Sequence, residues 1–205
     1  MSPRYRKQDG NQIKGNIRER LLQAAADEFS RVGFDKASVD KITSSAGVAT
    51  GTIYNYFDTK SDLLLKLLEE IGRDHIEYMA DHIRSQPDPI GRIDQLFSAG
   101  FDFVHQHPAQ ARVLFNNLQG PMTPIKEHLG TIYQPLTPLI ITEILQPGIE
   151  QGVFTVVPLI ETATMILTFY LGIGSLVDEE GNVPFDLKDI VNFVLRALGA
   201  EKQRE

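Results

Sequence analysis

Helical periodicity runs through almost the whole chain of 205 residues, and it limits the possible folds more than any other feature. Apolar side chains recur every three to four residues from Ile17 to Val32, as on one face of an amphipathic helix. Asn16 suits the start of this helix and Gly33 its end. Similar spacing returns in the stretches 90–106, 109–119, 158–177 and 186–199, without any alternating pair of strands. We therefore predict an all-α fold of about nine helices.

Proline interrupts the helical pattern in the middle of the chain. The stretch 125–151 is apolar and helical in spacing, but it contains Pro135, Pro138 and Pro147. Each interior proline removes one backbone hydrogen bond, so this element should be kinked or broken. Pro147 should also leave the carbonyl of Glu143, four residues earlier, without its helical partner.

Two short helices near the N-terminus are separated by a turn that contains glycine. Ser38 suits the N-cap of a helix over 39–46, Gly47 ends it, and a second helix is expected over 50–57. This arrangement is typical of a helix-turn-helix, whose second helix enters the major groove of DNA with its N-terminal residues nearest the bases. A further helix should begin at a capping box formed by Thr59 and Asp62.

A motif of about fifty residues carries a family resemblance. It includes Gly33-Phe34, Ala46-Gly47-Val48, Gly51-Thr52-Ile53-Tyr54-Asn55-Tyr56-Phe57 and Lys60 followed by Leu63-Leu64. This run resembles the DNA-binding domain of the TetR family of bacterial repressors. The resemblance implies that Tyr54 and Tyr56 approach the phosphate backbone, and that the rest of the chain is a variable helical domain for ligand binding and dimerisation. Ala49 departs from the family, where serine is frequent, so a phosphate contact at this position is not expected.

The predicted DNA contacts combine these arguments. The N-terminal residues of the second helix should face base edges, and helix N-termini at Ser38 and Lys60 favour phosphate. A purely structural capping role for Ser38 is an equal alternative. The predicted set is Ser38, Thr50, Gly51, Thr52, Tyr54, Asn55, Tyr56 and Lys60.

Charge is distributed unevenly along the sequence. Residues 1–60 hold ten Lys and Arg against seven Asp and Glu, whereas residues 61–205 hold ten against twenty. A basic end on an acidic chain can orient the molecule on a polyanion. The basic tail 3–7 is either a minor-groove arm or a solvated extension.

The remainder of the chain should hold an effector pocket and a dimer interface. We expect residues 14–74 to form the DNA-binding domain and residues 75–205 the ligand-binding and dimerisation domain. The expected effector contacts are Phe101, Phe103, Phe115, Asn116, Tyr133, Ile140, Glu143, Met165, Thr168 and Phe169. The helix over 158–177 is apolar on all sides and requires a partner on its second face, whereas the last helix carries its apolar residues on one stripe. The resemblance implies a four-helix bundle between two subunits, with Leu171, Gly172, Ile190, Val191, Val194 and Leu198 at the interface.

The sequence thus predicts a homodimeric repressor that a small-molecule effector releases from a palindromic DNA operator. Activation or corepression would use the same residues, and an architectural, nucleoid-associated protein without an effector is the alternative function. No catalytic motif is present, so an enzyme is not expected. His105 and His107 are two residues apart and do not face each other on a helix, so we expect neither metal nor cofactor. The stretch 159–177 carries Glu161 and three threonines, which favours a buried helix over a membrane span. The absence of cysteine and of an apolar secretory signal over residues 1–15 fits a cytoplasmic location, at the nucleoid for a DNA-binding protein.

Overall fold

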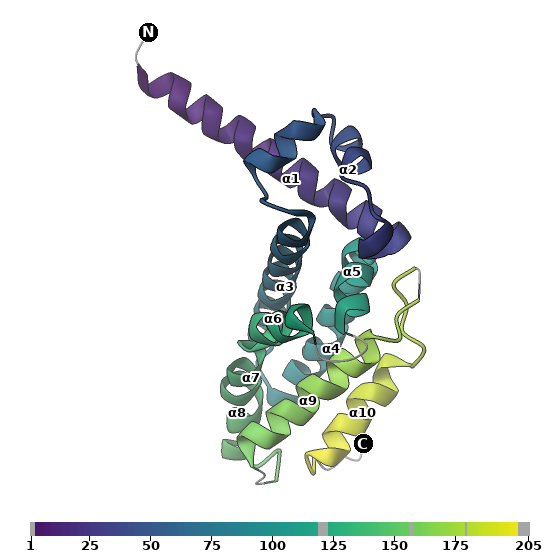
Figure 1. The fold of residues 1–205 in the computed structure, drawn as a ribbon. Coiled ribbons are helices and arrows are strands. Elements are labelled where there is room, and N and C mark those ends of the chain that lie inside the picture. Colours follow the sequence, from purple (N-terminus) through teal and green to yellow (C-terminus); the bar gives the residue numbers. More distant parts are fainter. Residues whose placement is uncertain (1–2, 119–122, 156–157, 179, 201–205) are drawn as a thin grey trace. The chain divides into compact units, whose positions relative to one another are not determined.

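The computed structural model describes residues 3–118, 123–155, 158–178 and 180–200. The chain divides into two compact units, an N-terminal unit, Met1–Glu70, and a C-terminal unit, Ile71–Glu205. Every regular element in the described residues is a helix, so the all-α prediction is confirmed (Figure 1).

The N-terminal unit contains three helical elements and the start of a fourth. They are α1 (Pro3–Lys36), α2 (Val39–Ser45), the 3₁₀ helix η1 (Thr50–Asn55) and the first turns of α3 (Lys60–Ser85). Helix α1 begins at Pro3, so the expected start at Asn16 was wrong. The expected stop at Gly33 is present as a kink inside α1, where Gly33 adopts a φ of 77° that disfavours side chains with a Cβ.

A small apolar core holds α2 and η1 against α1. Its central side chains are Phe29 of α1, Ile42 of α2 and Ile53 of η1, each at most 3% exposed. Phe57, which follows η1, is also buried. Gly47 makes the turn between the two short helices with a φ of 66°. The core therefore fixes the angle between α2 and η1 and leaves their polar residues outside.

Helix α3 begins with a reciprocal cap. The Thr59 hydroxyl oxygen accepts a hydrogen bond from the Asp62 N–H at 3.0 Å, and the Asp62 carboxylate accepts one from the Asp58 N–H at 3.0 Å. This confirms the predicted pairing of Thr59 with Asp62. The same helix continues past Glu70 into the C-terminal unit, where Ile71, His75 and Met79 lie one turn apart and are buried.

The C-terminal unit is a bundle in which α4 (Pro89–Gln106) packs against several neighbours, α10 (Leu187–Ala197) among them. Ile93, Leu96 and Phe97 of α4 are fully buried. The remaining helices are α4 (Pro89–Gln106), α5 (Pro108–Leu118), α6 (Pro124–Tyr133), α7 (Leu136–Leu139), the π-helix η2 (Ile140–Leu145), α8 (Gln146–Glu150), α9 (Leu159–Gly174) and α10 (Leu187–Ala197). Helices α9 and α10 are neighbours, since the rings of Phe169 and Phe193 lie 5.3 Å apart (Figure 1).

The proline-containing segment is distorted as the sequence predicts. Helices α7 and α8 are joined through the π-helical residues Ile140–Leu145, a wider winding than the α-helix. Pro147 lacks the N–H that would bond to the Glu143 carbonyl, and Arg92 donates to this oxygen instead, at 2.6 Å. An arginine of α4 thus replaces the hydrogen bond that the proline removes.

Among the described residues, no helix is long and apolar enough to cross a membrane.

Candidate nucleic-acid interface and effector site

The helix η1 is anchored to α2 through its first residue. The Thr50 hydroxyl donates to the Asp40 carboxylate at 3.0 Å and lies 3.4 Å from the Thr43 hydroxyl. Thr43 in turn donates to the Val39 carbonyl within α2. These bonds fix the N-terminus of η1, the end that a helix-turn-helix presents to base edges.

The expected helix over 50–57 is shorter in the structure and ends at Asn55. The amide of Phe57 still bonds to the Ile53 carbonyl, but the Asp58 amide is taken by the Asp62 carboxylate of the next cap. The chain therefore leaves the helix to meet the start of α3.

Six of the eight predicted DNA contacts lie together on or directly after η1. Gly51, Tyr54 and Asn55 are exposed, with Tyr54 at 57%. A Cβ on Gly51 would meet open space, so another molecule can approach its backbone closely. In a 3₁₀ helix residues three apart share a face, which aligns Gly51 with Tyr54 and Thr52 with Asn55. The helix η1 is thus a short exposed element that carries polar groups and whose backbone another molecule can approach closely.

Ser38 is fixed by its backbone rather than by its hydroxyl. Ser38 is the N-cap residue of α2, as predicted, but its side chain forms no cap hydrogen bond. Instead, the Ser38 amide donates to the buried Glu28 carboxylate of α1 at 3.4 Å, and Arg31 forms an ion pair with the same carboxylate. Burial raises the pKa of Glu28, but the bonds from Arg31 and Ser38 and the charges of Arg31 and Lys41 outweigh it, so this pKa lies below its ordinary value. A carboxylate of α1 therefore holds the start of α2.

Lys60 ties the start of α3 to the end of α1. Its ammonium group donates to the carbonyls of Phe34, Asp35 and Ala37 at 2.9, 3.3 and 3.2 Å, and lies 4.6 Å from the centre of the Phe34 ring. An ammonium has three N–H donors, and all three are used here. A phosphate contact by Lys60 would require breaking these bonds, so the geometry supports a structural role.

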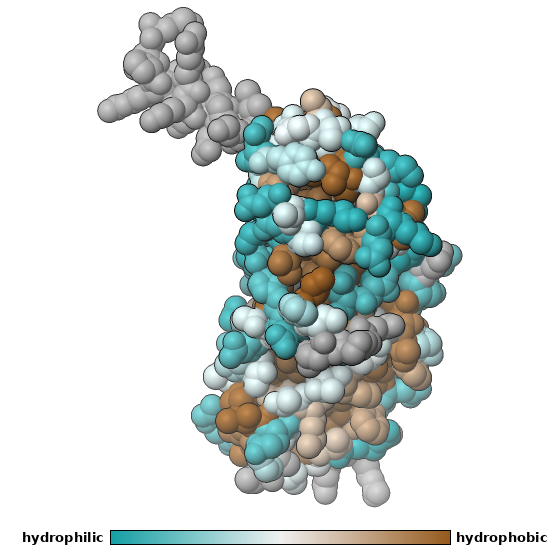
Figure 2. Space-filling model, viewed as in Figure 1, coloured by the Kyte–Doolittle hydropathy of each residue, from teal (hydrophilic) through white to brown (hydrophobic). Residues whose placement is uncertain are grey.

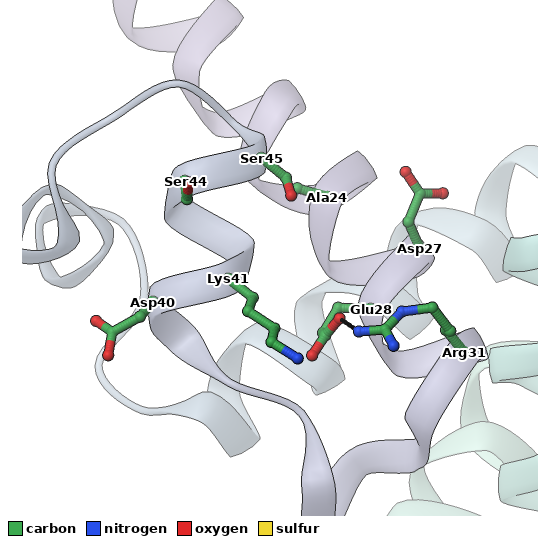
Figure 3. A pocket seen from close by; sticks show the side chains of 8 residues that line it. All are labelled: Ala24, Asp27, Glu28, Arg31, Asp40, Lys41, Ser44 and Ser45. Atoms are coloured by element: carbon green, nitrogen blue, oxygen red, sulfur yellow. Dashed lines mark hydrogen bonds and ion pairs between the residues drawn. The ribbon is translucent and has the colours of Figure 1, made fainter.

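A charged cleft of about 650 Å³ lies between α1 and α2 (Figure 3). Its walls carry both signs of charge, and no predicted effector contact belongs to it. The lining residues are Ala24, Asp27, Glu28, Arg31, Asp40, Lys41, Ser44 and Ser45.

The predicted effector contacts are divided between core and surface in the C-terminal unit. Phe101, Phe103, Phe115, Tyr133 and Ile140 are buried. Asn116, Met165 and Thr168 are exposed and Phe169 is half-buried, so they do not join these five in the core.

The effector role expected for Glu143 is not supported by its contacts. Its carboxylate lies 3.4 Å from Arg84 and 3.6 Å from Arg92. Two arginines already neutralise this carboxylate, so it is not a free anion that could attract a cationic ligand.

A buried polar cluster, which the sequence did not reveal, lies between α3, α4, α6 and α9. The His75 Nδ1 atom is 2.8 Å from the Tyr133 hydroxyl, and Nε2 is 2.8 Å from the Tyr170 hydroxyl and 3.2 Å from the Gly100 carbonyl. Burial, opposed by the Gly100 carbonyl, lowers the pKa of His75 to about 4. Burial also raises the pKa of both tyrosines. The signal for this cluster was a histidine at helical spacing between Ile71 and Met79 on an apolar stripe.

The predicted dimer residues on the last helix face the interior of their own unit. Ile190, Val191, Val194 and Leu198 are at most 6% exposed, so they cannot supply an interface, and this part of the prediction was wrong. Leu171 is half-buried and Gly172 is exposed.

Other apolar side chains of α9 and α10 are exposed instead. Ile160, Met165 and Phe193 are 67, 70 and 55% exposed, and a Cβ on Gly172 would meet open space. Figure 2 shows hydrophobic residues gathered where Figure 1 draws these two helices.

The two short helices, their glycine turn and the exposed polar η1 define a helix-turn-helix DNA-binding protein. Residues 21–67 match the sequence model of the "Bacterial regulatory proteins, tetR family". This match covers the helix-turn-helix of the N-terminal unit, so that segment is similar to the DNA-binding domains of this family of transcriptional regulators.

Relatives and solved structures agree with this assignment. The chain is 28% identical over 191 residues to the uncharacterised transcriptional regulator YvdT of Bacillus subtilis, which covers 88% of this chain and 94% of that protein. It is 29% identical over 136 residues to the fatty acid metabolism regulator protein of the same organism, and this match covers 64% of this chain and 70% of that protein. The fold is similar to that of the fatty acid degradation regulator FadR from Bacillus halodurans, with a TM-score of 0.76, 23% identity and coverage of 92% and 97%. It is also similar to FadR from Bacillus subtilis in complex with stearoyl-CoA, with a TM-score of 0.74, 24% identity and coverage of 88% and 96%.

Proposed function

We propose that this DNA-binding regulator is a homodimeric repressor that leaves a palindromic operator when an apolar effector, such as a long-chain acyl-CoA, binds its C-terminal unit. The observation that carries this proposal is the exposed η1, held by α2 and lying within the segment that matches the family. A regulator that binds chromosomal DNA would act in the cytoplasm, at the nucleoid.

The proposed base contacts come from Thr52 and Asn55. An asparagine amide can pair with the N6 and N7 atoms of adenine, and a threonine can contact the thymine methyl group. Tyr54 and Tyr56 can donate to phosphate oxygens, as can the unused hydroxyl of Ser38. Gly51 lets the backbone approach the groove without a steric barrier.

Dimerisation would cover the apolar face of α9 and α10. Ile160, Met165 and Phe193 carry this surface, and Gly172 allows close approach of a second helix. A two-fold dimer would present two copies of η1 to successive major-groove faces about 34–36 Å apart, which requires a palindromic site.

The proposed effector class is supported by the apolar core of the C-terminal unit and by the names of similar proteins. The buried aromatic rings of Phe97, Phe101 and Phe103 form an apolar environment suited to a hydrocarbon chain. Two similar proteins are named as fatty acid regulators, and one of the similar structures contains stearoyl-CoA.

The test begins with selection of operator sequences from a random duplex library, followed by fluorescence anisotropy with and without stearoyl-CoA. We expect a palindromic consensus, and release of the DNA on addition of stearoyl-CoA. Absence of any selected sequence would contradict the regulator function, whereas a consensus that stearoyl-CoA does not release would contradict the effector class.

The residue test uses Asn55→Ala on the selected operator. We expect a loss of about 1–3 kcal/mol for the operator and little change for random DNA, because a base contact is lost. Asn116→Ala, an exposed asparagine of α5, is the matched control and should change neither affinity. Equal losses on both DNAs would remove the base-reading role of Asn55.

A further inference from the structure

The excess positive charge of the N-terminal unit is concentrated in its first fifteen residues. Residues 1–15 carry four Lys and Arg against one acidic residue, Asp9, whereas residues 16–70 carry seven Lys and Arg against nine Asp and Glu. The helix-turn-helix and the helices that support it therefore have no positive excess of their own. The sequence-independent affinity of a protein for DNA comes from cations that neutralise phosphates, so the location of this excess matters for DNA binding.

Four of the seven cations outside this segment already have partners. Arg18, Arg31 and Lys66 form ion pairs with carboxylates of the same unit. Lys60 donates to three backbone carbonyls. A phosphate would have to displace these partners, which makes the segment 1–15 the main source of positive charge for a DNA contact.

The described part of this segment is helical and continuous with the rest of α1, which begins at Pro3. Its basic residues Arg4, Lys7 and Lys14 recur at helical spacing, and Arg18 follows four residues later. At 3.6 residues per turn, these four positions fall within a sector of about 80° around the helix axis. Arg4, Lys7 and Lys14 thus form a basic stripe along the first turns of α1.

The basic stripe leads away from the helix-turn-helix. Arg18, at its end, lies 5.9 Å from the centre of the Phe57 ring, directly after η1, and Arg20 donates to the Gly47 carbonyl in the turn at 3.4 Å. Figure 1 draws the first turns of α1, in purple, extending beyond α2 and η1. From Arg18 to Arg4 the helix advances by about 21 Å, which is the length of about six base pairs. The stripe can therefore reach DNA beyond the groove that η1 would enter.

The helical conformation of this segment determines which part of DNA it fits. An α-helix with its side chains is about 10–12 Å wide, whereas the minor groove of B-DNA is about 6 Å wide. A helix over residues 3–7 therefore does not fit inside the minor groove as an extended arm would. The phosphates along the edge of a groove present no such steric limit.

We propose that Arg4, Lys7 and Lys14 bind phosphates of the DNA that flanks the operator, and that this basic stripe supplies most of the sequence-independent affinity. This inference rests on the proposed function, because it adds a second DNA contact to the one made by η1. The two contacts divide the work: η1 reads bases, and the stripe holds the chain on DNA of any sequence.

The first test measures the salt dependence of DNA binding by the full chain. The triple variant Arg4→Gln, Lys7→Gln and Lys14→Gln removes the stripe. We expect the slope of log K against log salt to fall by about 2–3 for each subunit bound, on the operator and on random duplexes alike. A slope equal to that of the wild type would overturn the proposal.

A matched control changes the net charge equally at another place. Arg73, Lys188 and Arg196 are exposed cations of the C-terminal unit. Their joint replacement by glutamine should leave the wild-type slope in place, because no phosphate contact is lost. A slope reduced as much as in the stripe variant would assign the effect to net charge and overturn the proposal.

The second test separates a helix from a flexible arm. Gly10→Pro keeps every charge but interrupts the helix within the stripe, whereas Gly10→Ala favours the helix. We expect Gly10→Ala to retain the wild-type slope and Gly10→Pro to lose part of it. Equal slopes for the two variants would overturn the helical contact.

The third test changes the DNA. Operators with uncharged methylphosphonates at the flanking phosphates should bind the wild-type protein more weakly and bind the stripe variant unchanged. Netropsin, which occupies the minor groove, should not weaken the wild type more than the stripe variant. Selective weakening of the wild type by netropsin would place the segment in the minor groove and overturn the phosphate contact.

The outcomes separate this proposal from the proposed function. A selected operator that the stripe variant binds with the wild-type slope would overturn the stripe and leave the regulator function intact. Absence of any selected sequence would contradict the regulator function, and the slopes on random duplexes would still test the stripe.

Discussion

The two units of this chain place their polar and apolar residues in opposite ways. The N-terminal unit buries a small apolar core and exposes the polar residues of η1, whereas the C-terminal unit buries the His75 cluster and exposes Ile160, Met165 and Phe193. An exposed polar element suits the polar base edges and phosphates of DNA. An exposed apolar surface suits a second subunit, and a core rich in aromatic side chains suits an apolar ligand. The same helical architecture therefore presents a polar surface in one unit and an apolar surface in the other.

The largest effect is expected from a substitution that disrupts the exposed apolar face of the C-terminal unit. Phe193→Asp places a charge on the face proposed for dimerisation, so it should yield monomers by light scattering and weaken operator binding about a hundredfold or more, since two linked sites no longer act together. Ile90→Asp, on the exposed surface of α4, is the control and should remain dimeric. A dimer that persists in Phe193→Asp would move the interface away from α10.

The buried cluster should make stability depend on pH. The pKa of His75 is lowered to about 4, from an ordinary 6.5, mainly by burial. Below pH 6.5 the unfolded chain gains a proton that the folded chain binds only near pH 4. Stability should therefore be complete above pH 6.5 and fall by roughly 3 kcal/mol as the pH decreases to 4.

Urea unfolding at several pH values measures this effect in wild type and in His75→Gln. The variant should show a flatter curve between pH 6.5 and 4. His107→Gln, an exposed histidine whose charge also disfavours protonation of His75, should keep most of the wild-type slope. Parallel curves for wild type and His75→Gln would assign the pH dependence to other groups.

The next expected effect tests how tightly the C-terminal core is packed. Gly100→Ala adds a Cβ that would clash with the Tyr170 phenol, and should cost about 1–3 kcal/mol of unfolding free energy. Gly130→Ala, in α6 with open space at its Cβ, is the matched control and should stabilise slightly. Thermal denaturation compares the stabilities of the two variants. Equal stability would mean that the side chains around Tyr170 can shift to accommodate the added methyl group at little cost.

The smallest expected effect concerns the N-terminal unit. Lys60→Met keeps the aliphatic stem and loses the bonds to the carbonyls of Phe34, Asp35 and Ala37. It should cost about 1 kcal/mol in unfolding free energy and leave the salt dependence of DNA binding unchanged. Lys36→Met, an exposed lysine at the end of α1, is the control for stability. A salt slope reduced by about one would show that Lys60 contacts phosphate after all.

The N-terminal unit was the more predictable from sequence. Its helix-turn-helix depends on local signals, such as the turn at Gly47 and the pairing of Thr59 with Asp62, and both are present in the structure. The roles of Ser38 and Lys60 were less predictable, because their partners lie in other parts of the chain. Lys60 bonds to carbonyls 23 to 26 residues away, a distance that no local pattern reports.

The amino-acid sequence by itself determined the helical class, the position of the DNA-binding motif and the free carbonyl before Pro147. These features follow from backbone chemistry and from spacing within one helix, which neighbouring residues control. Only the tertiary structure decided that Arg92 takes this carbonyl, that Val194 faces inward while Phe193 faces outward, and that His75 meets two tyrosines. Each of these outcomes depends on which helix packs against which, and similar apolar stripes on several helices leave that choice open until the core forms.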